Sequence, residues 1–292
     1  MKHAKKIVIC ALFLLVAVSG LMTAAAAVRG DFDMKNMKEV SKEVSYEMKT
    51  FEVKEAFSDI YVEDAECNVR ILCATDGKCK VICQEKQDGS IYHTVTVSDG
   101  VLNVQRHDER KWYQYIGISF DDPDVEVYLP EKVYGQLSAR SVSGNIQVDD
   151  GFTFESASLE SVSGNVRMFS EVKKELNAET TSGRILLSHI RSSGITVKST
   201  AGKIQLTDVI AEKNLYVKSI SGGVMLDECD GSTIKIETTS GSVKGTILSD
   251  KIFITDSISG RVKVPRSSVG GECEVTTISG NITIELKAIV KD

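Results

Sequence analysis

Apolar and polar residues alternate over most of the chain after residue 45, and between residues 131 and 292 this alternation is organised into repeats. In nearly every repeat, apolar residues stand seven and five positions before a glycine and two and four positions after it. A period of 2 with many β-branched residues predicts half-buried β-strands. Counted from the glycine, the apolar positions lie at odd distances before it and at even distances after it. We therefore expect the chain to turn at the glycine.

A phrase of the form Ser/Thr-x-Ser-Gly-x-Ile/Val carries the repeat and occurs eight times, with one alanine (Ala201) in place of the serine before the glycine. Its glycines are Gly144, Gly164, Gly183, Gly202, Gly222, Gly241, Gly260 and Gly280. They recur at an almost constant interval, and a fixed period of this kind is typical of stacked-repeat architectures. Identical columns can stack only if successive turns run parallel, and parallel connections are almost always right-handed. The sequence therefore predicts an all-β fold, a right-handed parallel β-solenoid of about eight rungs, roughly 38 Å long at about 4.8 Å per rung.

The corner at each glycine suggests a structural role for the small residues around it. A residue without a Cβ can adopt backbone angles that are closed to others. Serine or threonine stands three positions before every glycine, and we expect this position and the serine directly before the glycine to continue the inward face. Their hydroxyls can bond backbone groups that the bend leaves unpaired. In the repeat that ends at Gly260, Ile252 and Ile254 stand one residue out of the apolar columns.

Residues 46–130 have a β pattern without the tight repeat. Two alternating stretches, 67–73 and 79–83, flank a Thr-Asp-Gly sequence at 75–77, which predicts a hairpin. A Ser-Asp-Gly sequence at 98–100 predicts another turn. We interpret the region as irregular first rungs or a small sheet that caps the open end of the solenoid, because an exposed strand edge recruits other chains.

The N-terminal sequence predicts that the protein is exported. Three lysines precede an uncharged run over residues 7–28, which is either a cleaved signal peptide or an anchor long enough to span a bilayer. We favour the anchor, and both alternatives place the rest of the chain outside the cytoplasmic membrane, anchored at the cell surface or secreted. Residues 29–45 are charged and suit a stalk. Removing residues 1–28 takes away three of the 35 basic residues and none of the 41 acidic ones, for a net charge of −9. We see no basic patch, so nucleic acid is not an expected partner.

Six cysteines lie outside the leader, four of them in the predicted hairpin. Cys73 can face Cys79 across the turn, and a disulfide between them is possible in an exported protein. The alternatives are cysteines that simply fill the core and a metal site. No pair of cysteines has the two-residue spacing that is typical of zinc sites. We predict no metal and no cofactor.

Candidate catalytic groups do not form a motif. His93, His107 and His189 are scattered, and the serines of the repeat are turn residues. The Asp-Asp-Pro-Asp sequence at 121–124 suits either calcium or a solvated turn. We therefore predict no catalytic residues and a protein that is not an enzyme.

One outward position is never charged. It lies two residues before each glycine and is occupied by Val142, Val162, Thr181, Thr200, Ile220, Thr239, Ile258 and Ile278. Three aromatic residues, Trp112, Tyr113 and Tyr115, also crowd one short segment, and exposed aromatics are common binding anchors. The candidate binding residues are therefore these aromatics together with Ile220, Ile258 and Ile278. The alternative is that the stripe only satisfies β-propensity or is covered by the N-terminal segment, while the aromatics plug the end of the solenoid.

The leader, the irregular β segment, the strand Val125–Pro130 with its Leu-Pro ending and the tandem Ser-x-Ser-Gly phrases together resemble the bacterial "putative adhesin" family of β-strand-repeat proteins. The family is a domain family of unknown function, and the resemblance extends over about residues 45–285. The resemblance implies a β-solenoid on the cell envelope, often membrane-anchored, with no catalytic residues to transfer. Our first hypothesis is a non-catalytic surface protein of the adhesin type, which presents the solenoid for binding a protein or glycan of the envelope. The alternatives are an anchored accessory protein in envelope-stress sensing and a carbohydrate-active β-helix enzyme.

Overall fold

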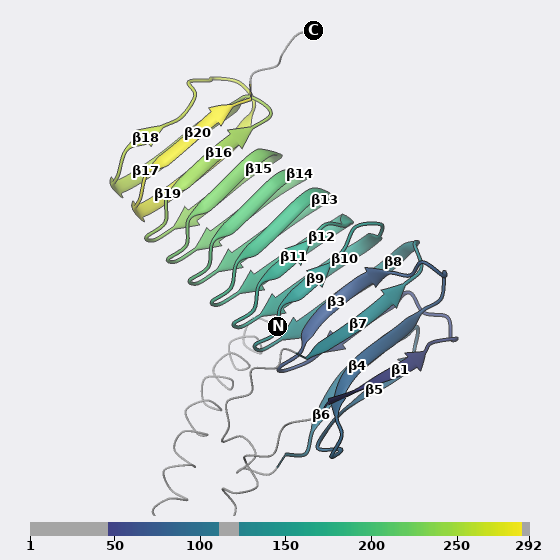
Figure 1. Ribbon diagram of the computed structural model, residues 1–292. Helices are drawn as coiled ribbons and strands as arrows, with labels where there is room; N and C mark the ends of the chain where they lie inside the picture. The colour runs from purple at the N-terminus through teal and green to yellow at the C-terminus, as the bar shows by residue number, and fades with distance from the viewer. Residues whose placement is uncertain (1–45, 111–122, 288–292) are drawn as a thin grey trace, which may run out of the picture. The chain divides into compact units, whose positions relative to one another are not determined.

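The computed structural model describes residues 46–110 and 123–287 and confirms the all-β solenoid (Figure 1). Hydrogen bonds join its strands into one continuous sheet that coils into stacked rungs. In each repeat one strand leads into the glycine corner and another leaves it, and both pair in parallel with their counterparts in the neighbouring rungs. Over the two described ranges no helix has the length and apolar character needed to cross a membrane. The predicted leader (7–28) and stalk (29–45) lie outside these ranges.

The strands of the repeats fall into three groups. The strands that lead into a glycine corner are β8 (Val133–Ser141), β10 (Thr153–Ser161), β12 (Glu171–Thr180), β17 (Lys251–Ser259) and β19 (Gly271–Ser279). The strands that leave a corner are β9 (Ile146–Val148), β11 (Val166–Met168), β16 (Val243–Ile247), β18 (Val262–Lys263) and β20 (Ile282–Leu286). Three long strands run from one glycine corner to the next: β13 (Ile185–Ser199), β14 (Ile204–Ser219) and β15 (Val224–Thr238).

The apolar columns form the core. Ile146, Val166, Ile185 and Ile204 stack in register in successive rungs and are fully buried. Burying each such side chain contributes about 1.5–3 kcal/mol, so neighbouring rungs stabilise one another. The stability of the fold therefore comes from stacked columns rather than from a single central cluster.

The N-terminal region supplies rungs and a cap, as predicted. Strands β2 (Asp59–Glu63) and β3 (Asn68–Cys73) pair in parallel with β8 and β9, and β6 (Val101–Asp108) and β7 (Asp124–Leu129) form the next rung outward. The first rung in the sequence thus lies between the second and the third. Three antiparallel strands complete this end: β5 (Ile91–Ser98) on β6, β4 (Lys80–Lys86) on β7 and β1 (Tyr46–Glu52) on β4.

The predicted hairpin is wrong, whereas the turn predicted at residues 98–100 is confirmed. Strands β3 and β4 are not partners, because β7 lies between them and pairs with both. The turn at Gly77 exists, with φ of +67°, but the strands on its two sides are separated. Strands β5 and β6 do form a hairpin. Its two turn residues, Asp99 and Gly100, both have positive φ, as a type I′ turn requires.

The last two repeats are also stacked out of chain order. Strands β19 and β20 lie between β15/β16 and β17/β18, so the repeat of Gly260 is the terminal rung. Ile252 and Ile254, which stand one residue out of the apolar columns in the sequence, do not line the core. Phe253 pairs with Cys273 on the inward column, whereas Ile252 and Ile254 face outward and are 44% and 51% exposed.

Residues 46–109 and 123–287 belong to one compact unit. Within its described part it has its own continuous core, and its strands pair with one another. A unit of this kind meets the requirements for independent folding. We therefore expect the fragment 46–292 to fold on its own.

Candidate functional site

Glycine is required at the corners because the backbone of a neighbouring rung lies very close, and not because the corner needs unusual backbone angles. A Cβ added to Gly202 would lie 1.5 Å from the carbonyl oxygen of Gly183, and one added to Gly222 would lie 1.7 Å from that of Gly202. None of the eight corner glycines has a positive φ. The conformational reason that we expected is therefore wrong. The side chain is missing because the next rung occupies its place.

In five of the eight repeats the hydroxyl three positions before the glycine accepts the N–H of that glycine and so closes the corner, as predicted. Ser161 Oγ accepts the N–H of Gly164 at 2.9 Å and donates to the carbonyl of Gly144 at 3.0 Å. Thr180 does the same between Gly183 and Gly164, at 3.1 and 3.0 Å. These hydroxyls are buried. Each one links two rungs through backbone groups that the bend would otherwise leave unpaired.

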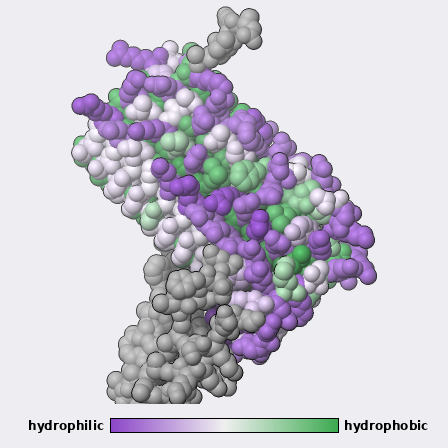
Figure 2. Space-filling model, in the orientation of Figure 1, coloured by the Kyte–Doolittle hydropathy of each residue, from purple (hydrophilic) through white to green (hydrophobic). Residues whose placement is uncertain are grey.

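The inward face ends at this hydroxyl, so the serine directly before the glycine is not on it. Ser143, Ser163 and Ser221 are exposed, and the prediction that they face inward is wrong. We use the name corner ridge for the uncharged residues two positions before the glycines: Val142, Val162, Thr181, Thr200, Ile220, Thr239, Ile258 and Ile278. In this ridge Ile220, Ile278 and Ile258 are 45%, 53% and 77% exposed. The ridge therefore presents apolar side chains to solvent. The face of the molecule drawn in Figure 2 mixes hydrophilic and hydrophobic residues.

The predictions for the aromatic residues of 112–115 and for the cysteine pair are not tested by the structure. Trp112, Tyr113 and Tyr115 lie outside the described residues, as do the first two aspartates of the sequence at 121–124. Cys73 and Cys79 are both free thiols, the first exposed and the second half-buried. They lie on either side of the Gly77 turn, and their disulfide stays a prediction.

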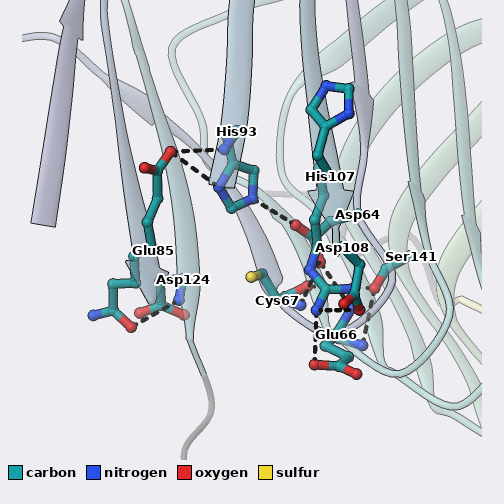
Figure 3. A network of polar contacts seen from close by, with 12 residues as sticks. Asp64, Glu66, Cys67, Glu85, His93, His107, Asp108, Asp124 and Ser141 are labelled. Atoms are coloured by element: carbon teal, nitrogen blue, oxygen red, sulfur yellow. Dashed lines mark hydrogen bonds and ion pairs between the residues drawn. The ribbon is translucent and has the colours of Figure 1, made fainter. Parts of the chain in front are cut away.

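The structure brings together a buried polar network that the sequence analysis missed (Figure 3). Glu63 pairs with Arg140 and Val69 pairs with Ile146, so Asp64 stands where the next rung has Ser141 and Cys67 stands where it has Gly144. Asp64 Oδ1 accepts the N–H groups of Glu66 and Cys67 at 2.8 and 2.6 Å. Asp64 is thus the counterpart of the corner hydroxyl in a degenerate first repeat.

His93 of β5 completes this network. Its Nε2 lies 2.8 Å from Asp64 Oδ2, and its Nδ1 lies 3.7 Å from Glu85 Oε1. Burial alone would raise the pKa of the Asp64 carboxyl, but hydrogen bonds from His93 and from the N–H groups of Cys67 and Glu66 outweigh it and hold that pKa below its usual value. The guanidinium of Arg106 lies 4.0 Å from Asp64 Oδ1 and pairs with Glu66 at 2.9 Å. The carboxylate is therefore surrounded by donors and buried in its ionised form.

A ladder of asparagines continues from this corner along the stack. Asn145 Nδ2 donates to Asn68 Oδ1 at 2.9 Å, and Asn165 Nδ2 donates to Asn145 Oδ1 at 2.8 Å. Asn68 itself donates to Asp124 at 2.9 Å. Each amide also accepts a backbone N–H of the next rung. The ladder fixes the register of the first rungs.

Comparison with known families agrees with this architecture. The family model described as Toastrack DUF4097 matches residues 57–173 and again residues 169–291. The chain belongs to this family. The Toastrack assignment confirms the resemblance to a β-solenoid domain family of unknown function. No curated protein matches the chain.

Solved structures of bacterial proteins are also similar to this chain. A "putative lipid binding protein" from Parabacteroides distasonis ATCC 8503 has a TM-score of 0.51 and 14% identity, over 82% of this chain and 96% of that one. A "putative adhesin" from Bacteroides fragilis NCTC 9343 has a TM-score of 0.43 and 15% identity, over 83% and 98%. A "putative adhesin" from Parabacteroides merdae ATCC 43184 has 0.43 and 12%, over 84% and 97%. At these identities the first structure shows a shared fold and no more.

The buried network of this Toastrack protein has limited chemical capacity. Asp64, Cys67 and His93 each offer a donor atom within 4.8 Å of the others, and zinc accepts all three ligand types. Structural zinc sites, however, have four protein ligands, and here the carboxylate is already engaged by His93 and two backbone N–H groups. Burial raises the pKa of the Cys67 thiol, which is the opposite of what a nucleophilic cysteine needs. As it stands, the network closes the first corner of the stack.

A signal for the network was present in the sequence. The segment Asp64-Ala65-Glu66-Cys67-Asn68-Val69 has the spacing of Ser141-Val142-Ser143-Gly144-Asn145-Ile146, with a carboxylate in place of the hydroxyl and cysteine in place of glycine. Aligning the two would have identified Asp64 as a corner residue. His93 gives no such signal, because its position depends on the antiparallel hairpin of β5 and β6.

Proposed function

We propose that this Toastrack protein is a non-catalytic protein of the cell envelope that binds an envelope partner through the corner ridge. The observation that carries the proposal is the exposure of Ile220, Ile258 and Ile278 on a scaffold that holds them in fixed positions. Burying one such side chain completely contributes about 1.5–3 kcal/mol. A partner that covers several half-exposed side chains of this kind gains enough free energy for specific binding. The cost in conformational entropy is small, because the scaffold already holds these side chains in place.

The ridge is built to stay extended. The N–H of Ser221 donates to the carbonyl of Thr200 at 2.8 Å, and the N–H of Ser240 donates to the carbonyl of Ile220 at 2.8 Å. The backbone ladder therefore continues through the corner while the side chains remain outside. A regular row of β-branched side chains suits an extended partner with matching periodicity.

Two further points support a binding role at the envelope. The solved structure with a TM-score of 0.51 has a name that refers to binding, and its name applies to that protein. The uncharged run over residues 7–28 supports export with the solenoid outside the cytoplasmic membrane, held there by this segment. Over the described ranges, no observation favours envelope-stress sensing or a carbohydrate-active enzyme.

A binding assay with matched variants tests the proposal. Fragment 46–292 is incubated with a washed envelope fraction from the source bacterium, and the retained protein is measured. The variant Ile220→Lys/Ile258→Lys should keep the melting temperature of the parent and lose most of its retention. The control Met48→Lys/Val133→Lys adds the same charge at exposed apolar positions away from the ridge and should bind like the parent. Equal retention of all three proteins would refute the role of the ridge.

A further inference from the structure

The two outer faces of the solenoid differ in how their charges are paired. On the strands that lead into the glycine corners, cations meet carboxylates of neighbouring rungs. Lys198 lies 3.9 Å from Glu179, Lys218 lies 3.3 Å from Glu237 and Lys235 lies 2.9 Å from Glu274. This face is therefore locally neutral.

The strands that leave the corners carry cations without such partners. Their outward positions, one and three residues after the glycine, contain no carboxylate in any of the eight repeats. We use the name basic face for this surface and its five cations, which are Arg167, Arg184, Lys203, Lys244 and Arg261. None of the five forms an ion pair within the described ranges, and all but the half-buried Arg167 are exposed. Lys263 also lies on this surface but pairs with Glu285 at 2.7 Å.

The arrangement places like charges side by side. Ile185 pairs with Ile204, so the preceding residues, Arg184 and Lys203, are neighbours in adjacent rungs. Like charges directly across a strand pair are destabilising. An anionic partner that covers the face removes this repulsion. Arg184 and Lys203 are 19 residues apart in the chain and become neighbours only when their rungs stack, so no basic patch is evident in the linear sequence.

Apolar side chains accompany the cations. Leu186 and the 42% exposed Met225 lie on the same outward column as Arg167 and Lys244. The corner ridge is three residues away from the first cationic position, a separation of at most about 11 Å. A surface that combines basic and exposed aliphatic side chains is typical of proteins that bind at the membrane interface.

We propose that the basic face and the adjoining corner ridge bind the anionic headgroups of a phospholipid bilayer. This inference rests on the proposed binding function and names the class of partner. A soluble polyanion would use the cations alone, whereas a bilayer also accepts the aliphatic side chains at its interface, so the bilayer accounts for both observations. Residues 46–292 hold 28 basic and 37 acidic residues, for a net charge of −9. Binding depends instead on the local charge at the outward positions one and three residues after the glycines, where no carboxylate stands, because distant charges are screened by salt.

Sedimentation with lipid vesicles tests the inference. Fragment 46–292 is mixed with vesicles of phosphatidylcholine alone and with vesicles in which phosphatidylglycerol replaces a minor part of the phosphatidylcholine. We expect binding to the anionic vesicles that weakens with salt. Each basic residue near an anionic surface contributes about 1 kcal/mol, or about fivefold in affinity. The variant Arg184→Gln/Lys203→Gln/Lys244→Gln should therefore bind roughly 100-fold more weakly.

The matched control removes the same charge from the other outer face. Lys198→Gln/Lys218→Gln/Lys235→Gln should bind the anionic vesicles nearly as well as the parent. Equal loss in the two triple variants, or equal binding to neutral and anionic vesicles, would overturn the proposal. Binding to long-chain polyphosphate but not to vesicles, with the same dependence on Arg184, Lys203 and Lys244, would also overturn it and assign the face to an anionic polymer.

The two proposals can fail separately. If envelope retention depends on Ile220 and Ile258 while vesicles do not bind, the ridge recognises another partner and the lipid inference is wrong. If vesicles bind through the basic face while the ridge variant retains full envelope binding, the role proposed for the ridge is wrong and the lipid inference stands, carried by the basic face.

Discussion

Replacing Gly222 with alanine tests the close approach of neighbouring rungs. The new Cβ would lie 1.7 Å from the carbonyl oxygen of Gly202, and it would also meet Ser219 Oγ at 3.0 Å. No rotamer relieves a clash of Cβ with backbone, so the corner must move away until this contact reaches at least 3.0 Å, the limit for real Cβ atoms. That movement strains the hydrogen bonds of Ser219 with the N–H and the carbonyl of Gly222, both at 2.9 Å. The two rungs would be forced apart at their tightest point.

The expected loss of stability is roughly 3–5 kcal/mol, because overpacking costs about 1–3 kcal/mol and each of the strained hydrogen bonds contributes about 1 kcal/mol. For a protein of this size the melting temperature should fall by about 6–20 °C, as measured by circular dichroism. Gly223→Ala is the matched control, because its nearest contact is Ser242 O at 3.4 Å and its φ is not positive. We expect this variant to stay within about 1 kcal/mol of the parent. Equal melting temperatures for the two variants would refute the close-approach explanation.

Three further predictions concern the corners and the thiols. Ser219→Ala leaves the N–H of Gly222 unpaired and should cost about 1–3 kcal/mol in urea denaturation, whereas the exposed Ser221→Ala should cost less than about 0.5 kcal/mol. The lowered pKa of Asp64 means that its ionised form stabilises the fold above the unfolded pKa of about 3.9 and that this contribution is lost as the pH falls through the lower folded pKa. Asp64→Asn should therefore be less stable at pH 7 and lose less stability between pH 5 and pH 2, and parallel pH profiles would contradict this. A maleimide at pH 7 should label the exposed Cys73 first, since burial raises the pKa of Cys79 to about 11, and labelling only after reduction would show that the predicted disulfide forms.

The repeat period was sufficient to predict the fold, because each column of identical residues is consistent with only one kind of stacking. The positions of Leu159 and Ile195 relative to their glycines predict inward columns, and these residues are fully buried. The order of the rungs could not be predicted in the same way. Every repeat presents nearly the same apolar columns, so the pattern itself does not say which repeats are neighbours. Which repeats become neighbours depends on the loops that connect the strands and on how apolar the inward column of each repeat is.

Functional features were predictable only where they belong to the repeat. The exposure of Ile220 follows from alternation and is observed. The basic face depends on charges from different repeats meeting across rungs, as Arg184 and Lys203 do, and no local window of sequence contains both. The Asp64–His93 contact depends on a strand that reverses direction at residues 99–100, so spacing along the chain gives no indication of it.

The reversed order of the last two repeats has a physical reason in their side chains. The inward positions of β17 hold Phe253, Thr255 and Ser257, a poorer column than the Cys273 and Val275 of β19. A rung inside the stack is covered on both sides, whereas the terminal rung is covered on one, so a polar inward residue costs less at the end. Placing β19 inside buries Cys273 and Val275 completely against Ile234 and Ile236 and leaves Thr255 half-buried. The burial of the best columns, rather than the order of the repeats along the chain, therefore accounts for which rung ends the solenoid.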